Sequence, residues 1–337
     1  MSDVVPASFR VSSQLVDGSR AFRGGIGGPH LDDTDTLATG LQRITVELLQ
    51  HSLHDLCGDE VGLDAAVAHT LGALDGVRAA LDLAAPEIGE DVLASELAVL
   101  DSAADRLLPA YRANRLVVRI DDIARRFDTV LRPGAFGEVR RMLAERATSE
   151  RTALVEDRRS FESTVHALRR AQARYLAWPT ADDELAAAYG RRPIAHAFDT
   201  VAPGLRATYR QGRRAHKAVT GGELHELAAW RTGSSRLCHQ LAVLRPLWPE
   251  VLDAMASSVQ QLTDHLAEHH DLIELEDAVR CGPQTDVAAS ALVALTTQRR
   301  AELLHAAGAA GARVYHEPTR RFLDRLAAYW DAWTVSR

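Results

Sequence analysis

The chain has 337 residues, of which 46% are hydrophobic and 25% charged, and its formal net charge is −7 at pH 7. This composition is that of a globular protein, which excludes the fibrous and disordered classes, and the length suffices for one large domain or two modest ones. The negative net charge argues against a general binder of nucleic acids or acidic membranes, so any anion must be held by a local group of arginines.

Cysteine usage and hydropathy indicate a cytoplasmic protein. Cys57, Cys238 and Cys281 are too few and too scattered for a disulfide framework or a cysteine metal site. No stretch reaches 18 uninterrupted apolar residues, and no basic region followed by an apolar one opens the chain. We therefore expect no membrane contact, no metal and no cofactor.

The residue pattern predicts an all-α protein. Residues 1–34 carry scattered glycines without a sustained period, which predicts an extended or loosely docked leader. From Asp35 onward, apolar residues recur at helical spacing, strand-like alternation is nearly absent, and proline or glycine separates the blocks. After a first helix that contains Leu41, Ile44, Leu48 and Leu49, the predicted blocks cover 60–84, 90–112, 114–128, 133–177, 181–188, 193–218, 222–244, 247–280 and 286–333.

The block 133–177 is long enough for either one extended helix or a helical hairpin. Trp178-Pro179, followed by an acidic segment, predicts a stop and a restart. We place the boundary between two helical halves near residue 185. The predicted organisation is a leader over 1–34, an N-terminal half over 35–185 and a C-terminal half over 186–333.

A basic segment in the block 193–218 is the strongest local signal. On a helix, Arg206, Arg210, Arg213 and Lys217 share one face, and Arg214 and Tyr209 lie beside it. Like charges at this spacing repel each other unless an anion lies among them. The alternative is a solvated basic face that pairs with acidic residues of neighbouring helices.

A second candidate lies in the block 247–280. His265 and His269 are four residues apart, which suits a shared metal ion, but the sequence offers no clear third ligand. His269 falls on the apolar face, so hydrogen bonding inside the bundle is the simpler interpretation. A third interpretation is acid–base chemistry, with Asp271 orienting a histidine.

A third candidate lies in the block 222–244, which contains Arg231 and His239. Gly233, Ser234 and Ser235 form a poor helix interior, since glycine alone costs about 1 kcal/mol there. Such a violation of propensity marks either a functional site or close packing against a neighbouring helix.

At these three candidates the chain resembles the CHAD family, the conserved histidine α-helical domain. The likeness is most specific in the segments 204–214 and 266–272 and in the tail 311–333. The resemblance implies two pseudo-symmetric helical bundles around a central basic cavity. It also implies that arginine, lysine and histidine side chains bind inorganic polyphosphate.

The chain departs from the family pattern where relatives carry histidine and several cations. Ala228 and Ala229, followed by Trp230 and Arg231, lead into Gly233-Ser234-Ser235, so the namesake histidine and three charges are absent. In the first half, Arg78 keeps a basic position and His69 is displaced by one residue. Arg112 is followed by Ala113 rather than by the aspartate of relatives.

These losses favour a small organic anion over a polymer, because a polyanion needs many evenly spaced cations. We expect an enzyme that binds a sulfated or phosphorylated molecule, free or presented by a carrier protein, and expels the anion during intramolecular cyclisation or elimination. Aziridine formation with loss of sulfate is one such reaction. The alternatives are a non-catalytic polyphosphate-binding protein and a structural remnant that binds no anion.

The expected roles divide between anion binding and proton transfer. In the enzyme hypothesis, Tyr209 donates to the leaving anion, and the base is His269 or alternatively His239 or Asp271. The aromatic tail with Tyr329, Trp330 and Trp333 is predicted to be exposed, where it could pack across a homodimer. The predicted anion-binding residues are Arg78, Arg112, Arg206, Arg210, Arg213, Arg214 and Arg231.

Overall fold

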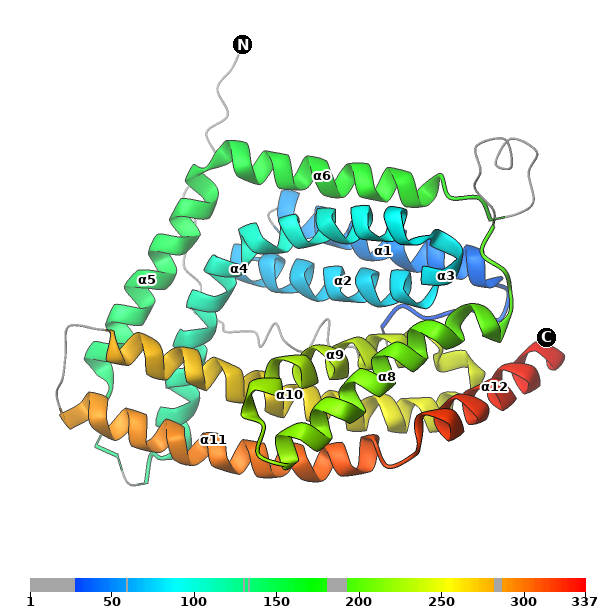
Figure 1. Cartoon of the computed structure of the whole chain (residues 1–337). Coiled ribbons are helices and arrows are strands. Elements are labelled where there is room, and N and C mark those ends of the chain that lie inside the picture. Colours follow the sequence, from blue (N-terminus) through cyan, green and yellow to red (C-terminus); the bar gives the residue numbers. More distant parts are fainter. Residues whose placement is uncertain (1–27, 59, 130, 133, 181–192, 282–286) are drawn as a thin grey trace, which may run out of the picture.

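Every regular element of the described chain is helical, which confirms the predicted all-α fold (Figure 1). The computed structural model describes residues 28–58, 60–129, 131–132, 134–180, 193–281 and 287–337. None of the helices in these ranges combines the length and the apolar character needed to cross a membrane.

The N-terminal helices and the C-terminal helices form two layers that face each other (Figure 1). The first layer contains α1 (Leu37–Cys57), α2 (Leu63–Leu83), α3 (Ala85–Ile88), α4 (Glu90–Arg126), α5 (Gly137–Glu156) and α6 (Arg158–Leu176). The second contains α8 (Phe198–Thr220), η1 (Leu224–Glu226), α9 (Leu227–Val243), η2 (Arg245–Leu247), α10 (Pro249–Arg280), α11 (Val287–Val314) and α12 (Thr319–Val335).

Three predicted blocks have different boundaries in the structure. The blocks 90–112 and 114–128 form one helix, α4, which continues through Pro109. The block 133–177 is neither one helix nor a hairpin, because Asp157 ends α5 and caps α6 through a bond from the Ser160 amide, so that the chain turns a corner there (Figure 1). The block 286–333 divides into α11 and α12, and the predicted helix 181–188 lies outside the described residues.

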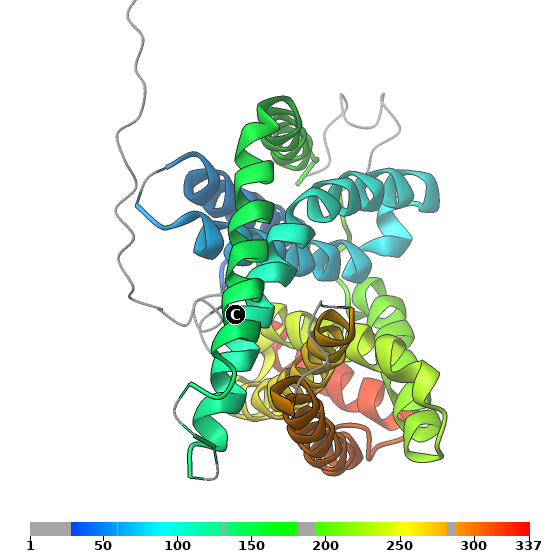
Figure 2. The ribbon, with the colours of Figure 1, turned by 90° about the vertical axis from the view of Figure 1, so that its left-hand side faces the viewer.

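Two apolar cores hold the layers together. The larger core extends from Leu37 on α1 to Trp333 on α12 and is continuous across both halves. The smaller core joins the far end of α4 to α5, α10 and α11, with Leu116, Leu143 and Leu275 among its buried residues. Figure 2 views the molecule from this end. The two long helices α4 and α10 therefore connect both cores.

The end of the predicted leader and the C-terminal tail dock onto each other. Residues 1–27 of the leader lie outside the described residues, but Leu31 is fully buried and its amide donates to the Val243 carbonyl at 3.0 Å. The indole of Trp333 donates to Asp33 at 3.2 Å.

The prediction of an exposed aromatic tail is wrong for two of its three residues. Trp330 and Trp333 are 3% and 5% exposed. Their rings pack against His196 of the same chain. Tyr329 is half-buried against Trp248. The tail therefore serves the fold of its own chain, and it provides no basis for the expected homodimer.

The irregular sequence Gly233-Ser234-Ser235 serves close packing between α8 and α9. A side chain at Gly233 would come within 3.2 Å of the Gly212 backbone, and one at Gly212 would overlap Tyr315. Ser234 and the Tyr315 hydroxyl form a hydrogen bond of 3.0 Å. Of the two interpretations of this segment, close helix packing is the one that the structure supports.

We predict that Gly212→Ala lowers the free energy of unfolding by about 1–3 kcal/mol, because the new methyl group overlaps the buried side chain of Tyr315, which packs against α8. Chemical denaturation of the full chain measures the effect. Gly137→Ala is the matched control, since nothing lies within 4 Å of the added methyl group. Equal stability of the two variants would contradict the packing argument.

Candidate functional site

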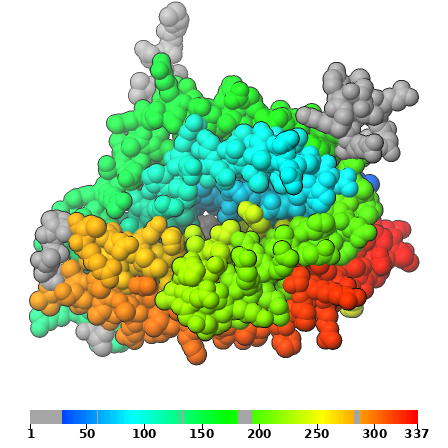
Figure 3. Space-filling view, viewed as in Figure 1, coloured from blue at the N-terminus to red at the C-terminus, as the bar shows by residue number. Residues whose placement is uncertain are grey.

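Four helices from both halves form a closed ring around a hollow. Helix α2 contacts α4 and α9, and α10 contacts the same two helices from the other side. In the space-filling view a hollow opens between α2 and α4 above and α9 and α10 below (Figure 3). We call this hollow the cleft. Side chains on these four helices supply its chemistry.

One group of charged side chains joins α4, α9 and α10. Arg112 Nε lies 3.7 Å from Glu274 Oε1, and His270 Nε2 lies 3.4 Å from the same oxygen. The hydrogen bond from His270, reinforced by the positive charges of Arg112 and Arg231, lowers the pKa of Glu274. Glu274 is therefore an ionised carboxylate that a histidine and two arginines surround.

Arg231 is the cation of this group that has no fixed partner. Its side chain is half-buried on α9. Its guanidinium forms no ion pair or side-chain hydrogen bond with any residue in the part of the chain that the structure describes. Because a guanidinium carries five N–H donors in a planar fork, Arg231 is able to receive an oxyanion.

A second group of charges joins α4 to α10 more deeply. Arg115 Nη2 and Arg119 Nε each lie 2.9 Å from Asp271 Oδ2, and Arg119 also pairs with Asp122. All three side chains of the central triad are less than one fifth exposed. Burial raises the pKa of the nearby Tyr111, so its hydroxyl is neutral. Asp271 is therefore occupied by ion pairs with Arg115 and Arg119.

A polar pocket between α4, α10 and α11 continues from this triad. Its lining includes Arg119, Arg126 and Arg299. Arg126 pairs with Glu302 at 2.8 Å and Arg299 with Glu268 at 2.7 Å. Each arginine of this pocket is thus neutralised by a carboxylate.

On the α2 side of the cleft, each arginine is likewise paired with a carboxylate. Arg78 pairs with Asp75 and Asp101 at 2.9 and 2.8 Å, and Arg236 pairs with Asp82 at 2.9 Å. His239 Nδ1 lies against Gly76, at 3.8 Å from the position of an added Cβ. Burial lowers the pKa of His239, which keeps the imidazole neutral at pH 7.

The predicted basic face of α8 is exposed and unpaired. Arg206, Arg210, Arg214 and Lys217 point to solvent and form no ion pair within the described ranges. Arg213 instead turns inward, where its Nε donates to the Tyr315 carbonyl at 3.3 Å. The chain therefore presents a row of four cations along one helix.

Tyr209 lies inside the protein rather than beside this row. It is fully buried, stacks on Phe322, and its hydroxyl donates to the carbonyls of Val314 and Glu317. Burial raises its pKa to about 12. The hydroxyl therefore links α8 to the segment between α11 and α12. It does not lie beside the exposed arginines with which the sequence grouped it.

His269 is buried on the side of α10 that faces α11. Burial, with the charge of Arg300, lowers its pKa to about 4, so the imidazole is neutral at pH 7. Arg300 pairs with Glu276, whose side chain is 1% exposed. Among the described residues, no group of three histidine, cysteine, aspartate or glutamate side chains is placed to hold a metal ion, so His265 and His269 belong to no such group.

His270, which joins the group around Glu274, was not among the predicted site residues. His270 and Glu274 are one helical turn apart on α10, a spacing that brings the two side chains together. The spacing of four residues between His270 and Glu274 can be read from the sequence, so it could have predicted this contact. Arg115 and Arg119 show the same spacing on α4, but their partner Asp271 is more than 150 residues away, so no local pattern reveals the triad.

Comparison with known proteins agrees with the helical architecture. The family model of the CHAD domain matches residues 47–280, well over half of the chain. The matched span contains all four helices of the ring and ends with α10, before the tail 311–333. No curated protein matches the chain.

We predict that Asp271→Asn lowers the free energy of unfolding by about 3 kcal/mol or more, because it leaves Arg115 and Arg119 buried without their carboxylate. Asp101→Asn is the control: this exposed partner of Arg78 contributes less than about 1 kcal/mol. Denaturation with urea compares the two. Similar small losses would show that the triad is not structurally important.

We predict that stability falls as the pH decreases from about 6.5 to 4. An unfolded histidine binds its proton below about pH 6.5, whereas folded His269 does so only near pH 4. Between these values the unfolded state holds more protons, so acid favours unfolding, by up to about 3 kcal/mol for this residue. Denaturation curves at pH 7.0, 5.5 and 4.5 measure the loss. His269→Gln removes this share, and an unchanged pH profile in the variant would contradict the assignment.

Proposed function

The chain belongs to the CHAD family, and we propose that it binds a small organic anion in the cleft and expels the anionic group during intramolecular ring closure. The observation that carries this proposal is the pairing of the cleft arginines. Arg78, Arg236 and the triad arginines each pair with a carboxylate, whereas Arg231 feels the charge of Glu274 but forms no ion pair with a residue that the structure describes. The positive charge that no ion pair compensates is therefore confined to Arg231, and it suits a single anionic group.

A polymeric anion fits this cleft poorly. A polyphosphate chain placed along it would meet Asp75, Asp101 and Glu274 as well as the arginines. Bringing phosphate groups next to these carboxylates, in a partly desolvated site, would weaken binding by several kcal/mol. The mixed charges of the cleft thus support a compact substrate that meets cations at one end and a carboxylate and an imidazole at the other.

The group around Glu274 supplies the two functions that expulsion of an anion requires. Guanidinium donors of Arg112 and Arg231 stabilise negative charge on the leaving oxygens. With Nε2–H donated to Glu274, His270 keeps the lone pair of Nδ1 and can accept a proton. In a substrate with an amine and a sulfate ester, the nitrogen attacks carbon, the carbon–oxygen bond breaks, sulfate leaves, and His270 takes the ammonium proton.

A second function has its own supporting observation. The exposed row of Arg206, Arg210, Arg214 and Lys217 has no acidic partner in the described part of the chain. Such a row suits a polyanion that follows the helix, which is the polyphosphate binding that the CHAD resemblance implies. The two functions use different residues, so single substitutions distinguish them.

We predict that sulfate and phosphate raise the melting temperature of the chain and that Arg231→Gln removes this effect, because ligands that bind the folded state stabilise it by mass action. Arg210→Gln is the matched control, since it removes an exposed α8 cation and leaves the cleft intact. Thermal unfolding at two salt concentrations measures both. Stabilisation by long-chain polyphosphate alone, lost in Arg210→Gln and at high salt, would contradict the cleft proposal and favour the second function.

The chemical step is tested with 2-aminoethyl sulfate, the simplest molecule that carries an amine and a sulfate ester. Ion chromatography follows the release of sulfate. We expect release above the protein-free rate, lowered at least tenfold by Arg231→Gln or His270→Ala and unchanged by His225→Ala, which alters an exposed histidine of η1. Release at the protein-free rate, with sulfate binding retained, would reduce the cleft to a binding site.

A further inference from the structure

The polar pocket between α4, α10 and α11 has room for a small molecule. It encloses about 190 Å³, which is the space of about six water molecules at about 30 Å³ each. Ile123 and Leu272 form an apolar floor, since both line the pocket and are buried in the smaller core. The walls carry the charged side chains of Arg119, Asp122, Arg126, Glu268 and Arg299.

Ion pairs hold these walls in position. Arg299 donates through Nε and Nη2 to the two Glu268 oxygens at 2.7 and 3.0 Å, and through Nη1 to Glu302 at 3.2 Å. Arg119 donates through Nη1 to Asp122 at 2.9 Å. Because each of these charges meets an opposite charge, the walls are formed before any ligand arrives.

The same ion pairs leave hydrogen-bonding capacity on the walls. Arg126 donates through Nη2 to Glu302, but its Nε and Nη1 donate to no residue that the structure describes. Each oxygen of Asp122 and of Glu268 accepts a hydrogen bond from one arginine, although a carboxylate oxygen has about two lone-pair sites. The pocket therefore offers both donors and acceptors to a ligand.

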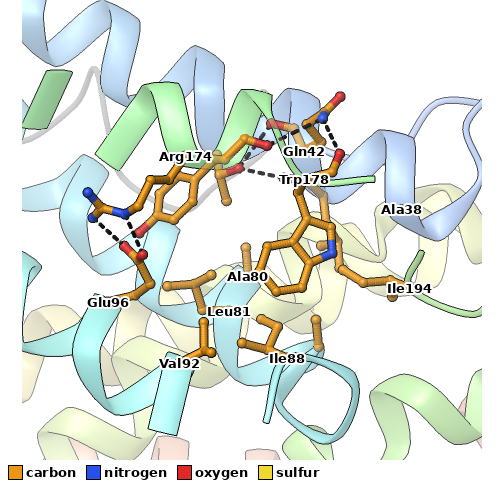
Figure 4. A pocket seen from close by; sticks show the side chains of 14 residues that line it. Ala38, Gln42, Ala80, Leu81, Ile88, Val92, Glu96, Arg174, Trp178 and Ile194 are labelled. Atoms are coloured by element: carbon orange, nitrogen blue, oxygen red, sulfur yellow. Dashed lines mark hydrogen bonds and ion pairs between the residues drawn. The ribbon is translucent and has the colours of Figure 1, made fainter. Parts of the chain in front are cut away.

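The apolar pocket of the N-terminal half is too small to take the same ligand (Figure 4). Helices α1, α2, α4 and α6 line it, and it holds about 50 Å³, the space of about two water molecules. The hydroxyl of Tyr175 is hydrogen-bonded to Glu96, which also accepts two hydrogen bonds from Arg174 (Figure 4). The polar groups at this end are thus already used.

The charges of the polar pocket disfavour a charged ligand. An anion would lie beside the carboxylates of Asp122 and Glu268, and a cation would lie beside the guanidinium groups, so either would meet like charge. A hydroxyl group has no net charge, and it both donates and accepts hydrogen bonds. It can accept from a guanidinium and donate to a carboxylate at the same time. A neutral molecule with several hydroxyl groups therefore matches these walls.

We propose that this pocket binds a neutral monosaccharide. The C–H groups on one face of the sugar ring lie on Ile123 and Leu272, and the hydroxyl groups bridge the arginines and carboxylates of the walls. Small-molecule sites commonly combine apolar contact with a few fixed polar groups in this way. The proposal does not rest on the function proposed for the cleft.

The class of ligand is tested with three sugars that share one ring and differ in charge. They are D-glucose, D-glucosamine as a cation at pH 6.5, and D-glucuronate as an anion, and ligand-observed NMR titration of the full chain measures each affinity. We expect D-glucose to bind about tenfold more tightly than either charged sugar, because each added charge meets like charge in the walls. Tightest binding of a charged sugar, or no binding of D-glucose, would overturn the proposal.

The location is tested with two neighbouring residues of α4. Asp122→Asn removes a charged acceptor from the wall, and the variant should fold normally because Arg119 keeps its ion pair with Asp271. Asp121→Asn is the matched control, since Asp121 pairs with Arg140 on α5 and does not line the pocket. We expect D-glucose to bind about tenfold more weakly to the first variant, because hydrogen bonds to charged groups are the stronger ones, and with unchanged affinity to the second. Equal affinities of the two variants would overturn the location.

Discussion

An arginine buried between helices needs a counter-charge, and this constraint organises the contact between the two halves. Asp271 holds Arg115 and Arg119 against α10, and Asp82 holds Arg236 against α2. Removing a partner from such a pair leaves a charge in a poorly solvated place, at a cost of several kcal/mol. The ring of α2, α4, α9 and α10 therefore depends on acidic residues that a purely anion-binding surface would not need.

The same pairing determines the distribution of charge along the cleft. Positive charge is cancelled along most of its length, and Arg231 remains unpaired beside Glu274 and His270. In the function that we propose, this site would hold one anionic group and His270 would accept a proton beside it. The uncancelled charges of α8 lie on an exposed face, where a longer polyanion would find them, and the two surfaces can be altered separately.

Helical periodicity predicted the fold class well, and the errors arose where tertiary contacts outweigh local signals. The predicted break at residue 113 does not occur, because Ala113 is buried and α4 continues beyond it with Leu116 and Ile120 in the smaller core. Trp330 and Trp333 look exposed in a polar C-terminal sequence, yet they pack on the core through His196. His269 was placed correctly on the apolar face of α10, where it is 5% exposed. Its neighbour His270 points the other way, toward Glu274.

The position of a bound anion tests the central claim most directly. Crystals of the full chain soaked in selenate, which has the shape and charge of sulfate, would show the anion by its anomalous scattering. We predict a peak within hydrogen-bond distance of the guanidinium groups of Arg231 and Arg112. Peaks confined to the row of Arg206, Arg210, Arg214 and Lys217, with an empty cleft, would contradict it.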